Sequence, residues 1–142
     1  MRVLIINGPN LSRLGTREPE IYGATTHNQL VEKCVSWGKS LGMEVEVRQS
    51  DAEAEVIDWL NDAAQSSIPV ILNPAAFTHY SYPIAEACKK NPAVVIEVHI
   101  SNPHSREEFR RKSVISPMVH GTIAGFGIDS YRLALLAIKD EQ

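Results

Sequence analysis

Residues 97–102 (EVHISN) carry side chains that could transfer protons. They close an apolar run that begins at Ala93 and has the character of a buried strand. Alternate side chains of an extended chain share a face, so Glu97, His99 and Ser101 project to the same side. An acid, an imidazole and a hydroxyl need partners if they are buried together. The segment alone is equally consistent with a polar pocket and with a hydrogen-bonded strand end.

His99 is a candidate general acid, because imidazole has an ordinary pKa of about 6.5. Glu97 could fix its tautomer and stabilise its charged form. Tyr22 is a candidate base in the polar segment 16–23. Free tyrosine has a pKa of about 10, so it needs a nearby cation to act as a base at neutral pH. Arg17 could supply that cation from a loop that closes as a lid, whereas the alternative for Tyr22 is an aromatic residue packed on the surface.

Other polar residues follow two further apolar runs. Asn7 and Asn10 follow the first run, and Asn73 follows the run at residues 70–72. The Asn73 amide could donate to a developing oxyanion or hold a water that does so, although an Asx turn is an equally ordinary use of this residue. Arg106 and Arg110 carry forked donors that suit a carboxylate or a hydroxyl-rich anion.

The elements that must position these residues alternate along the chain. Strand-like runs at residues 3–6, 45–47, 70–72, 94–100 and 122–126 are separated by helical patterns at 26–41, 52–65, 82–90 and 129–139. This pattern predicts one α/β domain over residues 1–142, with a flavodoxin-like five-stranded parallel sheet of order 2-1-3-4-5 and helices on both faces. Such sheets bind ligands at the carboxyl ends of their strands, so the polar residues should meet in one crevice. The long connections at 8–25 and 102–119 are expected to be functional or mobile.

Composition excludes several classes of function. The chain has 142 residues, a net charge of -3 and no long basic tract, which argues against nucleic-acid binding. No apolar run approaches the roughly 20 residues that span a bilayer, and the N-terminus does not resemble a signal peptide, so a cytoplasmic location is expected.

Cys34 and Cys88 fall on helical patterns among apolar residues, so neither is expected to be catalytic or disulfide-bonded. Residues 125–130 lack the third glycine of a dinucleotide fingerprint.

A set of motifs extends over nearly the whole chain. They are Ile6-Asn7-Gly8-Pro9-Asn10-Leu11 with Leu14-Gly15, Arg17-Glu18-Pro19 through Tyr22-Gly23, Gln49-Ser50, Asn73-Pro74 with Thr78-His79, residues 97–102, and Arg106-Glu107 through Arg110. With these motifs the chain resembles the type II 3-dehydroquinate dehydratase family. The resemblance implies a flavodoxin-like fold in a dodecamer of four trimers that converts 3-dehydroquinate to 3-dehydroshikimate and water. It implies no metal, no cofactor and no Schiff base.

The resemblance also implies roles for individual residues. Tyr22 resembles the base that removes a C2 proton, Arg17 the lid arginine that favours its ionised form, and His99 the acid that protonates the departing hydroxyl. Glu97 would orient His99. Asn10 and Asn73 resemble a pair that orders a water at the enolate oxygen. The residues that resemble the contacts to the carboxylate and hydroxyl groups of the substrate are His79, Ile100, Ser101 and Arg110.

The chain departs from the family pattern at two positions. Glu86 stands where the family has an aspartate that reaches a neighbouring subunit's site, and we group it with the substrate-binding residues. Ala75 stands where glycine is usual, so its Cβ could crowd a tight turn or the ligand. Two alternatives remain open: a metal-dependent enzyme that uses Glu97, His99 and His104, and a non-catalytic ligand-binding domain of the same fold. Biosynthesis of aromatic compounds and breakdown of quinate both fit the reaction.

Overall fold

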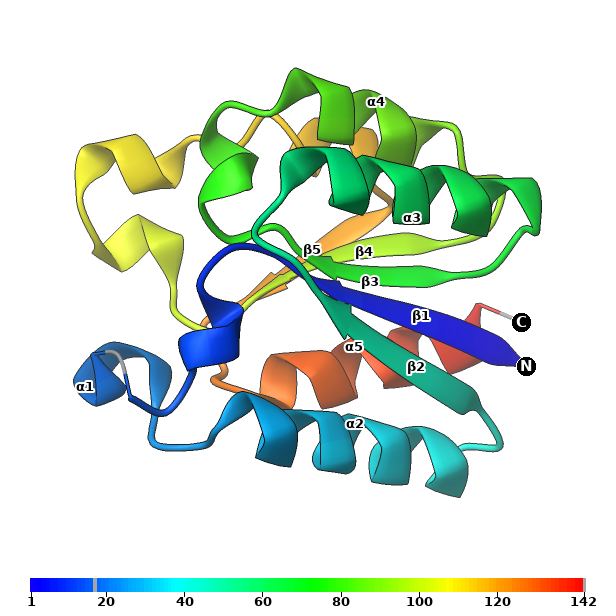
Figure 1. Ribbon diagram of the computed structural model, residues 1–142, viewed down its shortest axis with the longest axis horizontal. Coiled ribbons are helices and arrows are strands. Elements are labelled where there is room, and N and C mark those ends of the chain that lie inside the picture. Colours follow the sequence, from blue (N-terminus) through cyan, green and yellow to red (C-terminus); the bar gives the residue numbers. More distant parts are fainter. Residues whose placement is uncertain (17, 142) are drawn as a thin grey trace.

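The computed structural model describes residues 1–16 and 18–141, which form a five-stranded parallel sheet between two layers of helices (Figure 1). Every pair of neighbouring strands is parallel. The strands are β1 (Arg2–Asn7), β2 (Glu44–Gln49), β3 (Val70–Asn73), β4 (Val95–His99) and β5 (Gly121–Ala124). Their order is β2-β1-β3-β4-β5, which confirms the predicted flavodoxin-like topology.

The helices cover both faces of the sheet, as predicted. They are α1 (Pro19–Tyr22), α2 (His27–Ser40), α3 (Glu53–Gln65), α4 (Tyr82–Lys89) and α5 (Asp129–Asp140). In Figure 1, α2 and α5 lie on one face and α3 and α4 on the other. Short 3-10 turns occupy the loops: η1 (Leu11–Arg13), η2 (Ala75–His79), η3 (Pro103–Ser105), η4 (Glu108–Arg111) and η5 (Ser116–Met118).

Local sequence explains where α2 begins and ends. The Thr26 hydroxyl accepts from the Gln29 N–H, and the Gln29 side chain accepts in return from the Thr26 N–H. This reciprocal capping box satisfies two donors at the start of the helix. Gly42 follows the last turn with a φ of 77°, a left-handed conformation that favours glycine. The predicted bounds of this helix are therefore confirmed.

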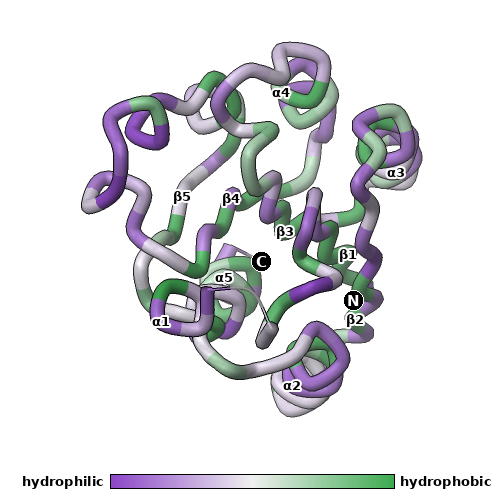
Figure 2. Tube along the Cα trace, turned by 60° about the vertical axis from the view of Figure 1, so that its left-hand side comes forward, coloured by the Kyte–Doolittle hydropathy of each residue, from purple (hydrophilic) through white to green (hydrophobic). Residues whose placement is uncertain are grey.

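Two apolar cores pack against the sheet, one on each face. Val3 and Ile5 of β1 enter the core with α2 and α5, whereas Leu4 and Ile6 enter the core with α3 and α4. This division follows from the alternation of side chains along a strand. Figure 2 shows apolar residues along the strands and polar residues on the outer surfaces of the helices. A strand that is buried on both faces reads as a continuous apolar run, which made β1 recognisable in the sequence.

The last two strands are shorter than predicted. β4 begins at Val95 and ends at His99, and β5 ends at Ala124. Gly125 adopts a φ of 93° and its N–H donates to the His99 carbonyl, so the chain turns away from the strand direction two residues before the predicted end. None of the helices formed by the described residues has the length and apolarity that crossing a bilayer requires.

The two cysteines are buried on opposite faces of the sheet. Cys34 lies on α2 in one core and Cys88 on α4 in the other, and both are free thiols. Burial raises the pKa of each thiol to about 12. The prediction that neither forms a disulfide is confirmed.

Candidate active site

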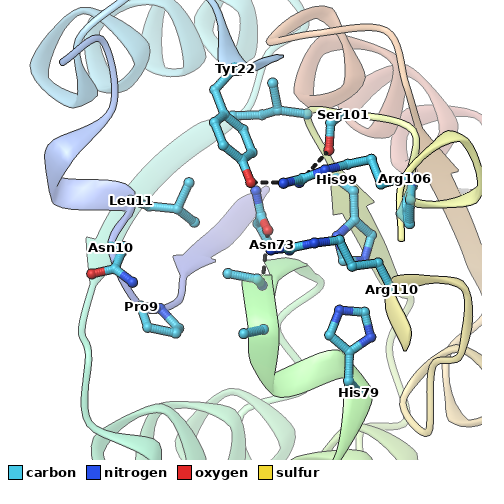
Figure 3. A pocket seen from close by; sticks show the side chains of 14 residues that line it. Pro9, Asn10, Leu11, Tyr22, Asn73, His79, His99, Ser101, Arg106 and Arg110 are labelled. Atoms are coloured by element: carbon cyan, nitrogen blue, oxygen red, sulfur yellow. Dashed lines mark hydrogen bonds between the residues drawn. The ribbon is translucent and has the colours of Figure 1, made fainter. Parts of the chain in front are cut away.

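A polar pocket lies at the carboxyl ends of β1, β3 and β4, where the fold predicts a ligand site (Figure 3). Its lining residues come from all the strand ends that the sequence singled out. They are Pro9, Asn10, Leu11, Tyr22, Asn73, Ala75, Ala76, His79, His99, Ile100, Ser101, Pro103, Arg106 and Arg110. The structure therefore brings together most of the predicted site residues. Glu97 lies behind His99 and not on the pocket wall.

His99 and Glu97 form a hydrogen-bonded pair at the end of β4. The Nε2 atom of His99 donates to Oε2 of Glu97 across 2.5 Å. Glu97 has no solvent exposure, and the His99 side chain is 12% exposed. Since Nε2 is engaged, Nδ1 is the ring nitrogen that remains for a ligand. The pair has the arrangement of a proton donor oriented by a second group.

Hydroxyl groups surround the Glu97 carboxylate. The Thr78 hydroxyl donates to Oε2 across 2.6 Å, and the Ser116 hydroxyl donates to Oε1 across 2.5 Å. Burial by itself raises the pKa of Glu97, but the hydrogen bond and charge of His99 and the two hydroxyl donors outweigh burial and hold the pKa below its ordinary value. A charged carboxylate at this position stabilises an imidazolium at His99.

Ser113 belongs to the same cluster. Its Oγ is 2.5 Å from Oγ1 of Thr78, and it accepts from the backbone N–H groups of Ile115 and Ser116. Because Thr78 donates its single proton to Glu97, Ser113 must be the donor in this pair. Ser113 and Ser116 were not predicted from the sequence. Their only signal was their place in the long connection after β4.

Tyr22 meets a cation on the wall of the pocket. The Nη1 atom of Arg106 donates to the Tyr22 hydroxyl across 2.6 Å, and the guanidinium carbon lies 5.2 Å from the ring centroid. Arg106 also contacts Ser101 at 3.4 Å and Glu18 at 3.8 Å. Its side chain is 14% exposed. The sequence suggested Arg106 only as an anion ligand, whereas the structure places it on the phenol oxygen. Arg17, the predicted partner of Tyr22, lies outside the described residues.

Asn73 both forms a turn and lines the pocket, the two possibilities that the sequence left open. Its Oδ1 accepts from the Ala75 N–H across 3.1 Å, which is the predicted Asx turn, and its side chain also lines the pocket. The Nδ2 atom donates to the Tyr131 hydroxyl across 2.9 Å. Ala75 has a φ of 50°, a left-handed conformation in which a Cβ is unfavourable. The alanine that stands here in place of the usual glycine is therefore strained, and it lies in the pocket wall.

The loop after β1 holds Asn10 at the pocket. Asn10 has a φ of 67°, and its backbone N–H donates to Asp51 Oδ1 across 2.9 Å. This hydrogen bond, together with one from Gln49, lowers the pKa of the Asp51 carboxyl. Gly8 passes so close to the next loop that an added Cβ would lie 2.8 Å from the Pro74 carbonyl oxygen. The close approach keeps the β1 and β3 loops together at the site.

His79 and Arg110 form the side of the pocket nearest η4 (Figure 3). The Nδ1 atom of His79 donates to the Lys112 carbonyl across 2.7 Å, so Nε2 remains for a ligand. Arg110 pairs with Glu107 across 2.6 Å. Their charges and donors suit an anionic, hydroxylated ligand.

Two of the predictions concern a residue outside this pocket and a metal site. Glu86 is exposed on α4 and is not among the residues that line it. The alternative metal site is not assembled, because no group of three His, Cys, Asp or Glu side chains among residues 1–16 and 18–141 is placed to hold a metal ion.

The fold and site define an α/β enzyme of flavodoxin-like topology with a pocket at the carboxyl ends of its central strands. Comparison with known proteins agrees. The family model for class II dehydroquinase matches residues 1–139. The 3-dehydroquinate dehydratase of Salinispora tropica is 55% identical over 135 residues, which cover 95% of this chain and 94% of the relative. That of Thermus thermophilus is 48% identical over 139 residues, or 97% of this chain and 93% of the relative.

A solved structure gives the same result. The type II dehydroquinase of Propionibacterium acnes superposes with a TM-score of 0.96 at 50% identity, covering 98% of this chain and 96% of that one. This chain belongs to the class II dehydroquinase family.

Proposed function

We propose that this protein converts 3-dehydroquinate to 3-dehydroshikimate and water by stepwise elimination through an enolate. The observation that carries the proposal is the presence of two different proton-transfer units in one pocket, the Tyr22–Arg106 contact and the His99–Glu97 pair. Membership of the class II dehydroquinase family supports the choice of substrate.

Tyr22 is the proposed base. Its hydroxyl is held by Arg106, and a guanidinium that donates to the phenol oxygen stabilises negative charge there. The tyrosinate removes a proton from C2 of the substrate, and the electron pair of that C–H bond passes to the carbonyl oxygen as an enolate. Arg17 lies in the same loop and is proposed as a second cation near the tyrosine.

Asn73 and Asn10 are proposed to order a water at the enolate oxygen. Both residues line the pocket, and Asn73 is held there by two hydrogen bonds of its own amide. A donor that is fixed before the reaction stabilises the developing charge without having to reorganise. Removal of one such donor typically lowers kcat by about 10²–10³-fold.

His99 is the proposed acid for the second step. The enolate electrons return, the C1–O bond breaks, and the departing hydroxyl takes a proton from His99 to leave as water. Glu97 orients the ring through Nε2 and stabilises its charged form. Proton exchange with solvent then restores the tyrosinate and the imidazolium.

Substrate binding is proposed for His79, Ile100, Ser101 and Arg110, which would contact the carboxylate and hydroxyl groups. Glu86 is exposed on α4, which is compatible with the proposal that it reaches a neighbouring subunit's site in a dodecamer of four trimers. We propose a cytoplasmic location and a role in the shikimate pathway or in quinate breakdown. A sedimentation profile that contains only monomer would refute the proposed assembly.

The decisive experiment follows the enone absorbance of 3-dehydroshikimate after EDTA-treated protein is mixed with 3-dehydroquinate. A borohydride-treated sample runs in parallel. We expect rapid product formation in both samples. Tyr22→Phe and His99→Ala should each reduce kcat by at least about 10²-fold, as the loss of a positioned proton-transfer group does. Substrate binding without product in the folded wild type would instead identify a non-catalytic binding domain.

A further inference from the structure

A chain of hydrogen bonds leads from the pocket into the interior of the protein. Asn73 contacts the Tyr131 hydroxyl at 2.9 Å, Tyr131 contacts Asn7 at 2.7 Å, and Asn7 contacts His27 at 3.1 Å. Tyr131 lies on α5 with no solvent exposure, and it is not among the residues that line the pocket. The proposed mechanism assigns no role to Tyr131, Asn7 or His27.

The direction of every bond in this chain follows from one backbone group. The Ala75 N–H can only donate, so the Asn73 atom that it contacts is Oδ1, and Nδ2 faces Tyr131. Because Nδ2 can only donate, the Tyr131 oxygen accepts from it. The Tyr131 proton must then go to Oδ1 of Asn7.

The last bond sets the tautomer of a histidine. Since Oδ1 of Asn7 faces Tyr131, the Nδ2 group of Asn7 faces Nε2 of His27. Nε2 must therefore accept, and His27 is neutral with its proton on Nδ1. Burial lowers the pKa of His27, which favours this neutral form. Burial also raises the pKa of Tyr131 well above its ordinary value, so its hydroxyl keeps the proton that it donates.

We propose that Tyr131 is a positioning residue for the dehydration, through the one-way chain Asn73 to Tyr131 to Asn7 to His27. In this series of hydrogen bonds, one N–H of the Asn73 amide donates to Tyr131, which fixes the Asn73 side chain. The second N–H of the amide is then the donor that faces a ligand in the pocket. Without the Tyr131 hydroxyl, the bond from the strained Ala75 is the one hydrogen bond from residues 1–16 and 18–141 that still orients this amide. The Asn73 donor would then be free to turn away from the enolate oxygen.

Kinetics of Tyr131→Phe test the proposal, and this test rests on the proposed function. The substitution keeps the ring and removes only the hydroxyl. We expect kcat to fall about tenfold, the effect of losing one ordinary hydrogen bond in the transition state, and KM to change by less than about threefold because Tyr131 is outside the pocket. Tyr82→Phe, at a tyrosine that is 62% exposed, is the matched control and should leave both constants unchanged.

The outcomes separate this proposal from the proposed function. Circular dichroism at the assay temperature checks that the variant is folded. An unchanged kcat in folded Tyr131→Phe would overturn the positioning role while the wild-type reaction stands. A wild type that makes no 3-dehydroshikimate would overturn the function instead.

A second measurement does not depend on turnover. Nitrogen-15 NMR of the imidazole rings in the wild-type protein at neutral pH reports which ring nitrogen carries the proton, with His27→Gln used to assign the signal. We expect Nδ1 of His27 to be protonated and Nε2 to be unprotonated. A proton on Nε2 would reverse the last bond and overturn the one-way chain.

Discussion

Glu97 is a carboxylate with no contact with solvent, and its charge depends on three donors. His99, Thr78 and Ser116 each donate to it, so burial does not neutralise the group. A buried charge is tolerated only when such partners satisfy it. The same donors that stabilise the fold around Glu97 therefore keep the carboxylate charged beside His99.

The lowered pKa of Glu97 predicts how stability depends on pH. A carboxyl whose pKa is lower in the folded than in the unfolded state stabilises the fold above the unfolded value, here 4.5, and this contribution is lost as pH falls through the folded value. In Glu97→Gln, the free energy of unfolding should therefore fall less steeply than in the wild type below about pH 4.5. Urea titrations at several pH values measure both slopes. Parallel curves would contradict the assignment.

Single residues also show where prediction from sequence reached its limit. Glu97 and His99 were predictable as a pair because their spacing on a strand places them on one face. The contact between Tyr22 and Arg106 joins residues 84 positions apart in the two long connections. No periodicity encodes such a contact. The sequence accordingly suggested the nearby Arg17 as the partner of Tyr22.

At the scale of elements, the sheet was predictable and the short helices were not. The buried strands read as apolar runs, and Thr26 with Gln29 marked the start of α2. By contrast, α1 has four residues, fewer than an isolated helix needs for stability. Contacts with the rest of the protein must hold it in place. Residues of the connections at 8–25 and 102–119 line the pocket, but the short helical turns within these connections were not foreseen.

Arg106 is the side chain that ties α1 to the opposite loop. It contacts Tyr22 at the end of α1 and Glu18 at its start. Arg106→Gln should therefore increase amide hydrogen exchange of Tyr22 and Gly23 about tenfold or more, because α1 loses its anchor. Hydrogen exchange with mass spectrometry or NMR measures this, with α3 amides as the internal reference. Unchanged exchange in α1 would show that other contacts hold the helix.

Across the whole molecule, rigid and loop-borne groups meet at one edge of the sheet. His99 ends β4 and Asn73 ends β3, whereas Tyr22 and Arg106 come from the two long connections. The sheet therefore provides fixed geometry for the proposed acid and the proposed oxyanion donor, and the long connections bring the proposed base. With fixed groups on the strands and the proposed base in a long connection, substrate can enter the site before that connection brings the base into place.

The burial of both cysteines makes the protein slow to react with thiol reagents. Cys34 is fully buried and Cys88 is 2% exposed, and their raised pKa values leave almost no thiolate at neutral pH. Native protein incubated with excess maleimide at pH 7 should remain unmodified by mass spectrometry, whereas protein in urea should gain two adducts. Modification of the native protein at either cysteine would contradict this expectation.

The same burial makes the natural chain a suitable host for spectroscopic labels. An exposed thiol introduced as Ser66→Cys, at the end of α3 and away from the pocket, would be the only one that reacts quickly. Each copy of the chain would then carry one fluorophore or spin label at a known position, with both natural cysteines left intact. Distances between labels on different copies would test the proposed assembly directly.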